Sequence, residues 1–235
     1  MSSLAPAPVA APASAVHPRG GNAPAAREWE HRRFPGKRAT EYTPARKAGR
    51  DALVVRAAAS ASMLRHRVHV PPQALSTVRF SWFLPALIDA ADLHERDADD
   101  SPLRIVLAFE GDRSRFSTRD AALSELAHAL TGEPMPYATL MYVWSNASAT
   151  DAVVRAPRTD RIRSIVVESG AARLNRWIDY ERDIRADFER AFGEAPGALV
   201  GVALLSDTDN TGAMAQAWYG PLSLSRRSAQ QSVRH

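Results

Sequence analysis

Hydrophobic positions along the chain fall into short runs that are typical of β-strands. Residues 78–84 alternate, so that Val78, Phe80 and Trp82 share one face of a strand. Residues 103–109 and 138–144 are almost continuously apolar, as expected for central strands. Similar runs occur at residues 52–57, 63–70, 161–168, 199–205 and 217–224. The pattern therefore predicts roughly eight strands.

Two segments have helical spacing instead. In residues 119–130 and 180–192, apolar side chains recur every three or four positions, and a glycine follows each segment. The predicted apolar stripes are Ala122, Leu123, Leu126 and Leu130 in the first helix, and Ile184, Phe188, Ala191 and Phe192 in the second. Many strands with only two helices favour a mainly β fold, an antiparallel β-sandwich of jelly-roll type with two short covering helices.

Composition divides the chain into three parts. Residues 1–27 are mostly Ala, Pro, Ser and Gly, so we predict a disordered leader. Residues 28–224 are expected to form one β-sandwich domain, and residues 225–235 a flexible tail. The leader lacks the basic start and continuous apolar core of a secretory signal peptide. No apolar run approaches the ~20 residues of a membrane helix, so no membrane span is expected.

Charge and cysteine content exclude some classes of function. The formal net charge is +4, and there are no cysteines, so disulfides and thiolate metal sites are excluded. Residues 1–70 hold 12 Lys and Arg against 4 Asp and Glu. No aromatic residues are interleaved with a basic cluster, and no RNA-binding motif is present, so a nucleic-acid partner is not expected.

The apolar run at 199–205 ends in an acidic turn that contains Asp207, Asp209, Asn210 and Gly212. The spacing matches the first positions of a calcium-binding EF-hand loop, but Trp218 stands at the twelfth position, where a glutamate is required. An EF-hand is therefore excluded. Three alternatives remain: a structural turn in which Asp and Asn bond the backbone, a structural calcium site, and direct ligand binding or catalysis.

A second acidic segment, residues 89–100, lies ahead of the strand predicted at 103–109. Asp99 and Asp100 directly precede this strand, so they are the members of the segment best placed in an ordered site. We predict that they would join Asp207 and Asp209 as oxygen ligands of a cation. The alternative is that the segment is a solvated loop.

Carboxylates at strand ends are also candidates for catalysis. Glu110 and Asp112 follow the strand at 103–109, and with Asp207 and Asp209 they could serve a polysaccharide hydrolase or lyase as acid and base. The distance between the carboxylates decides this question, and the sequence does not give it.

Trp144, Ser145 and Asn146 form the best candidate corner for binding a sugar, because an aromatic ring is joined there to an amide. Tyr142 and Asn210 are the other candidate ligand-binding residues. The alternative for the aromatic residues is packing in the core.

Several segments together carry a resemblance to a known family. They include residues 29–42 (WEHRRFPGKRATEY), 60–64 (SASML), 78–82 (VRFSW), 99–109 (DDSPLRIVLAF), 136–146 (PYATLMYVWSN), 161–170 (RIRSIVVESG), 176–193 (RWIDYERDIRADFERAFG) and 201–212 (GVALLSDTDNTG). Over residues 28–224 the chain resembles the bacterial domain of unknown function 3047. The resemblance implies a periplasmic or extracellular protein with a sandwich similar to carbohydrate-binding jelly rolls, and it supplies no catalytic residues.

These observations lead to one expected function and two alternatives. We expect a noncatalytic module that binds a carbohydrate or another cell-envelope ligand. The alternatives are a polysaccharide hydrolase or lyase that uses strand-end carboxylates, and a protein–protein interaction module.

Overall fold

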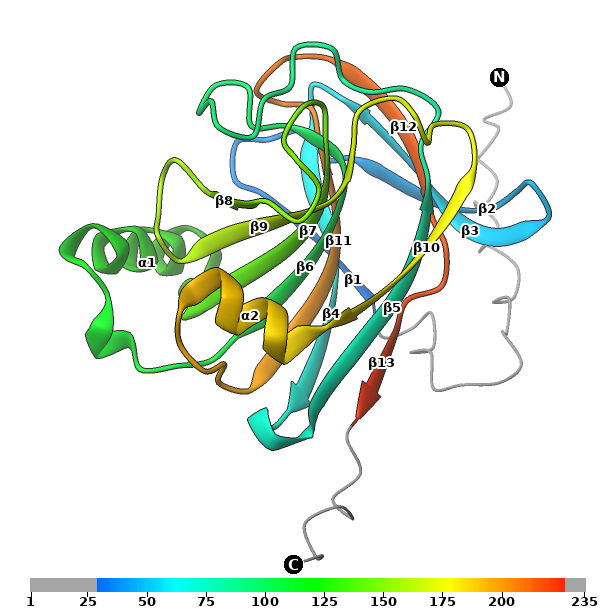
Figure 1. Cartoon of the computed structure of the whole chain (residues 1–235). Helices are drawn as coiled ribbons and strands as arrows, with labels where there is room; N and C mark the ends of the chain where they lie inside the picture. The colour runs from blue at the N-terminus through cyan, green and yellow to red at the C-terminus, as the bar shows by residue number, and fades with distance from the viewer. Residues whose placement is uncertain (1–28, 227–235) are drawn as a thin grey trace, which may run out of the picture.

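Two β-sheets packed face to face form the body of the protein in the computed structural model, which describes residues 29–226 (Figure 1). One sheet has seven strands and curls like half a barrel; the other has six. The prediction of a mainly β, sandwich-like fold with two helices is confirmed. No helix among residues 29–226 has both the length and the apolar character needed to cross a membrane.

The seven-stranded sheet has the order β1-β4-β11-β6-β7-β9-β8. Its neighbours are antiparallel except for β7 and β9, which run parallel. The strands are β1 (Trp29–Arg33), β4 (Ala61–Val70), β6 (Ser101–Phe109), β7 (Ala138–Ser145), β8 (Val153–Arg155), β9 (Ile162–Ser169) and β11 (Leu199–Asp207).

The six-stranded sheet has the order β10-β5-β12-β3-β2, and β13 pairs with β5 beyond the end of β12. Its strands are β2 (Glu41–Lys47), β3 (Arg50–Ala58), β5 (Leu75–Phe83), β10 (Trp177–Asp183), β12 (Met214–Tyr219) and β13 (Ser223–Arg226). The helices are α1 (Thr118–Thr131) and α2 (Ile184–Phe192), with short 3-10 turns η2 (Pro72–Ala74) and η3 (Arg113–Arg115).

The core lies between the sheets and is rich in aromatic side chains. The alternation of β5 points Phe80 and Trp82 inward, where Trp82 has no exposed surface. From the opposite sheet, Tyr142 stacks on Phe80 with ring centroids 5.7 Å apart, and Trp144 lies 6.3 Å from Trp82. Burying each large apolar side chain of this kind contributes roughly 1.5–3 kcal/mol to folding, so these rings hold the two sheets together.

Several predicted boundaries differ from the structure. The strands β1, β2, β8 and β10 were not predicted, because they are partly exposed and lack an apolar run. The strand predicted at 217–224 is two strands, β12 and β13, and they are separated at Gly220. A side chain at Gly220 would place its Cβ 2.1 Å from Ser81 Oγ, so the chain passes close to β5 here and any other residue would force Ser81 to shift.

Helix α2 begins at Ile184 rather than at Tyr180, because residues 177–183 pair with β5 as a strand. The Asp183 carboxylate caps the helix by accepting the Ala186 amide at 3.0 Å. The predicted apolar stripe is otherwise found in place, with Phe188 fully buried against Phe109 at 4.7 Å.

Helix α1 forms where it was predicted, but its apolar stripe is not buried. Leu126 and Leu130 are 55% and 60% exposed, whereas the buried residues are Asp120 and Ser124. Polar contacts hold the helix at both ends. Asp120 accepts a hydrogen bond from Thr159 in the β8–β9 connection, and Glu133, just past the helix, pairs with Arg65 of β4.

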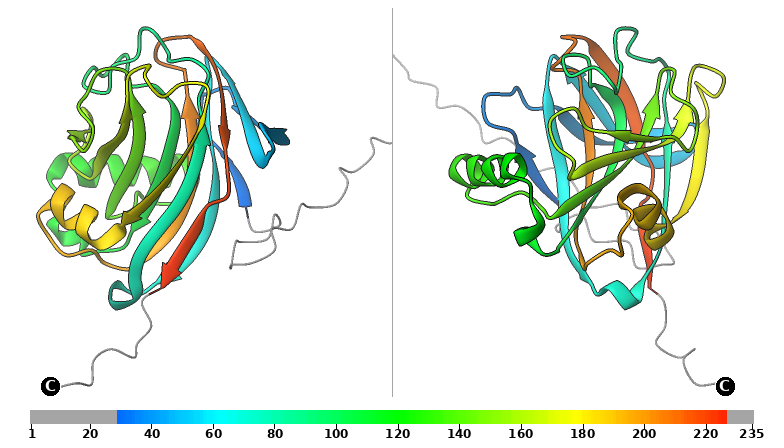
Figure 2. Two further views of the ribbon diagram at one scale, coloured as in Figure 1. Left: turned by 45° about the vertical axis from the view of Figure 1, so that its right-hand side comes forward. Right: turned by 60° about the vertical axis from the view of Figure 1, so that its left-hand side comes forward.

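These two anchors lie near opposite edges of the seven-stranded sheet, so α1 crosses its outer face. A helix of 14 residues is about 21 Å long, which matches the roughly 19 Å spanned by four interstrand spacings. Figure 2 shows both helices on the side of the molecule opposite the β2–β3 hairpin.

The predicted leader at residues 1–27 lies outside the described residues. Ser225 and Arg226, expected to begin the flexible tail, belong to β13, and residues 227–235 again lie outside the described part.

Candidate functional site

A pocket of about 370 Å³ opens on the outer face of the seven-stranded sheet. Its floor includes Leu205 of β11, Met141 of β7 and Ser164 of β9. These side chains point outward because they alternate with the residues that fill the core. Three connections complete the walls: β1–β2 contributes Phe34, Pro35 and Lys37; β5–β6 contributes Leu93, Arg96 and Asp99; and β8–β9 contributes residues 156–159.

Arg104 of β6 is the buried charge at the centre of this site. Its side chain is only 5% exposed. Its Nη2 donates to the Asp99 carboxylate at 2.9 Å and to the Asp99 carbonyl at 3.0 Å. Its Nε donates to Asp207 Oδ1 at 3.1 Å. One guanidinium thus joins the β5–β6 connection to the end of β11, with the planar donor geometry for which arginine is suited.

Asp207 is held by a backbone group as well, because its Oδ1 also accepts the Ser101 amide at 2.9 Å. Burial, with smaller contributions from the nearby Asp100 and Asp99, raises the pKa of Asp207 to about 6. Arg104 and the Ser101 amide act in the opposite direction and do not cancel the effect of burial.

Asp100 and Asp209 complete the acidic turn. Asp100 is 1% exposed, and its two oxygens accept the Asn210 amide at 3.2 Å and the Thr211 amide and hydroxyl at 2.7 Å each. Asp209 pairs with Lys37. The Asn210 side-chain amide donates to the Asp99 carbonyl at 3.2 Å. The turn is therefore tied to the β5–β6 connection by hydrogen bonds in both directions.

The structure brings together three of the four aspartates that were predicted as cation ligands. Asp100, Asp207 and Asp209 each place one carboxylate oxygen within 4.8 Å of the others, which is close enough to hold a cation. The groups that bind these carboxylates are those expected for a structural turn. Backbone amides donate to Asp100 and Asp207, the Arg104 guanidinium donates to Asp207, and the Lys37 ammonium group binds Asp209. The turn is thus stabilised by the protein's own donors.

The predicted sugar-binding corner lies in the interior. Trp144 is 1% exposed, and its indole N–H donates to the Gly170 carbonyl at 3.0 Å. Tyr142 has no exposed surface, and its hydroxyl donates to Asp187 at 3.0 Å. Asn146 uses its amide to hold the carbonyls of Ile88 and Ala91 at 2.7 and 2.9 Å. Neither aromatic ring offers a face to a ligand. Only Asn210, of the four residues predicted to bind a ligand, lines the pocket.

Glu110 and Asp112 are not brought near Asp207 and Asp209. Asp207 pairs with the start of β6, whereas Glu110 follows its end, so the two groups are separated by on the order of 27 Å of strand. Asp112 caps the 3-10 turn η3 by accepting the Ser114 amide at 2.9 Å. Hydrogen bonding from the side chain and the amide of Ser114 lowers the pKa of Asp112. No acid–base pair can form between the two ends of the sheet.

Sequence reasoning missed the cationic part of the site. Lys37, Arg96, Arg104 and Arg158 all line the pocket, and none was predicted. Arg104 carried a signal, because it is the one charged residue in the apolar run at 103–109. A charge inside a buried strand requires a buried partner.

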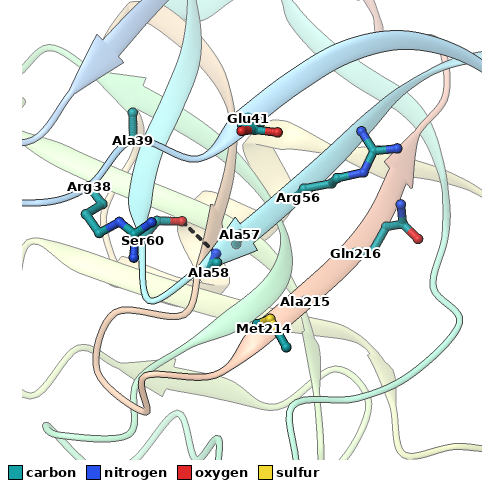
Figure 3. Close-up of a pocket in the computed structure, with 10 residues that line it drawn as sticks. All are labelled: Arg38, Ala39, Glu41, Arg56, Ala57, Ala58, Ser60, Met214, Ala215 and Gln216. Atoms are coloured by element: carbon teal, nitrogen blue, oxygen red, sulfur yellow. Dashed lines mark hydrogen bonds between the residues drawn. The ribbon is translucent and has the colours of Figure 1, made fainter.

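A second pocket, of about 490 Å³, lies on the outer face of the other sheet (Figure 3). Glu41, Arg56 and Gln216 form a row there, because the register places them side by side on β2, β3 and β12. These side chains are exposed, and Met214 beside them is 84% exposed. This pocket contains no buried charge comparable to Arg104, so we regard the smaller pocket as the candidate site.

Comparison with known proteins gives a family and weak likenesses to solved structures. The family model described as "Protein of unknown function (DUF3047)" matches residues 27–223. No curated protein matches the chain. The xyloglucanase domain of NopAA, a type three effector from Sinorhizobium fredii solved with cellobiose, aligns with 9% identity and a TM-score of 0.45, covering 85% of this chain and 93% of that one.

A protein from Bacteroides thetaiotaomicron, described as a candidate glycoside hydrolase, aligns with 10% identity and a TM-score of 0.37. The alignment covers 80% of this chain, which thus spans little more than half, 57%, of that protein. Scores this low give no indication of function.

The raised pKa of Asp207 predicts the pH dependence of stability. Between about pH 3.8, the ordinary pKa of the group, and about pH 6, the Asp207 carboxyl group is protonated in the folded protein but ionised in the unfolded chain. This contribution is fully present below about pH 4 and is lost as the pH rises through about 6. The quantity to follow is the unfolding free energy of the wild type minus that of Asp207→Asn. We expect this difference to be larger at pH 4 than at pH 7.5, by up to about 3 kcal/mol. Urea denaturation across this range measures it. A difference that stays constant or decreases would show that Arg104 keeps the carboxylate ionised.

The donors around the acidic turn predict its response to calcium. Because the protein's own donors, including Lys37 and Arg104, already bind the carboxylates of the turn, we expect 1 mM CaCl2 to leave the melting temperature within about 1 °C of its value in EDTA. Differential scanning calorimetry at constant ionic strength measures the shift. A rise of several degrees in the wild type that disappears in Asp209→Asn would instead establish a structural calcium site.

Proposed function

The chain belongs to the DUF3047 family of proteins of unknown function, and for this member we propose a noncatalytic role as a saccharide-binding module. The pocket on the outer face of the seven-stranded sheet is the proposed binding site. Its mixture of apolar and polar side chains is the observation on which the proposal rests.

A sugar ring offers C–H groups on its faces and hydroxyl groups around its edge. The floor of the pocket supplies apolar surface through Leu205 and Met141. Around this floor stand the amide, carboxylate and guanidinium groups of Asn210, Asp99 and Arg96, which can donate to or accept from neighbouring hydroxyls. Binding sites for small polar molecules commonly combine a mainly apolar lining with a few convergent polar groups.

The arrangement of the carboxylates favours binding over catalysis. Asp99 and Asp207 both accept hydrogen bonds from the same guanidinium, and Asp209 pairs with Lys37. Carboxylates held in this way orient ligands and neighbouring groups, but they are not free to exchange protons with a glycosidic oxygen. Glu110 and Asp112 lie too far away to supply the missing partner.

One observation favours the alternative of a polysaccharide hydrolase or lyase. Asp207 lines the pocket, and its pKa of about 6 is suited to a general acid near neutral pH. Catalysis would also require a second carboxylate about 5–9.5 Å away that is free to act as a base or nucleophile. The release of new reducing ends from a bound glycan, abolished in Asp207→Asn, would favour this alternative.

The binding proposal is tested by blocking each pocket in turn. We expect a glycan array of cell-envelope saccharides to identify ligands, and isothermal titration calorimetry to measure their affinity. Ala156→Trp should fill the proposed site and weaken saccharide binding at least about tenfold. A loss of about 1.4 kcal/mol of binding free energy has that effect.

The matched control is Ala58→Trp, which makes the same change in the pocket on the other sheet. Its affinity should equal that of the wild type. Failure of every saccharide to bind would contradict the proposed function. Loss of binding in Ala58→Trp alone would place the site on the six-stranded sheet.

A further inference from the structure

We infer that the pocket recognises an acidic saccharide, one that carries carboxylates such as those of uronic acids, and that Arg96 and Arg158 bind its anionic groups. This inference rests on the proposed function and specifies the chemical class of its ligand.

Every carboxylate that lines the pocket is bound by a cation of the pocket. Its three carboxylates are Asp99, Asp207 and Asp209. Arg104 binds the first two, at 2.9 and 3.1 Å, and Lys37 binds the third. The pairing uses Arg104 and Lys37 and leaves no carboxylate of the pocket without a cation.

Two cations remain. Arg96 comes from the β5–β6 connection and Arg158 from the β8–β9 connection, and both are exposed and line the pocket. Within residues 29–226, neither guanidinium has a carboxylate partner. The two connections form different walls of the same pocket, so a ligand seated on the floor lies within reach of both.

Guanidinium groups are suited to carboxylates because they can donate two parallel hydrogen bonds. A neutral sugar gives Arg96 and Arg158 only hydroxyl acceptors. An acidic sugar adds charge-assisted hydrogen bonds, and these should raise its affinity at least about tenfold over that of the neutral sugar. The ligand class is therefore distinguishable by affinity alone.

The experiment compares chemically matched ligands. A set of uronate oligosaccharides and their carboxyl-reduced counterparts, in which each carboxylate is converted to a hydroxymethyl group, is titrated into the full chain by calorimetry. We expect the best uronate ligand to bind at least about tenfold more tightly than its reduced form. In the double variant Arg96→Gln/Arg158→Gln this preference should disappear, because the affinity for the uronate falls at least about tenfold more than the affinity for the reduced form.

The control double variant, Arg38→Gln/Arg56→Gln, removes the same charge from the pocket on the other sheet. This control should retain the preference for the uronate over its reduced form. Its result distinguishes local contacts in the proposed site from general attraction between a basic protein and an anion. A preference that the control loses equally would overturn the inference.

The remaining outcomes separate the two proposals. Equal affinity of the wild type for acidic and reduced ligands, or binding of neutral glycans only, overturns the acidic ligand and leaves the saccharide-binding function standing. Absence of binding to every acidic and neutral glycan overturns both. Competition by inorganic phosphate as strong as that by the uronate would also overturn the inference, because the site would then select charge and not a sugar.

Discussion

The buried guanidinium of Arg104 is the interaction on which the candidate site depends. It lies on a central strand, where its neighbours along the chain fill the core between the sheets, and it faces the pocket on the other side. Removing a charge from water costs several kcal/mol unless carboxylates compensate for it. Asp99 and Asp207 provide that compensation and are fixed in position by it. The acidic turn after β11 and the connection before β6 are thus joined, and together they form one wall of the pocket.

The two faces of the seven-stranded sheet differ in composition, and this difference determines which face can form a binding site. The inner face carries Tyr142 and Trp144, whose polar atoms are satisfied by Asp187 and Gly170 within the interior. Aromatic rings committed to joining two sheets cannot also serve as a platform for a sugar. The outer face has smaller side chains and charged connections, and α1 crosses it without packing its leucines against it. In the proposed role, recognition on this face combines the apolar floor of the pocket with hydrogen bonds and charge.

How far the sequence predicts the structure differs from element to element. The strands β6, β7, β9 and β11 were predicted because both of their faces are buried, whereas β1 and β10 are stabilised by neighbours that are remote in the sequence. The stripe of α2 is buried, but that of α1 is exposed, since spacing predicts a helix without stating which side faces the protein. The aspartates at strand ends could be named from the sequence. Their cationic partners could not, because Lys37 and Asp209 are 172 positions apart and meet only through the sheet topology.

The most direct test of this account is the cost of removing the Arg104 charge. Arg79 is a matched control, because it also uses Nε and Nη2 to bind a carboxylate, that of Glu181, but does so on the surface, where both side chains are more than half exposed. Urea denaturation at pH 7.5 should show that Arg104→Met loses about 3–5 kcal/mol of unfolding free energy. Arg79→Met should lose far less, because solvent screens this exposed pair. Equal small losses in the two variants would contradict the central role of Arg104.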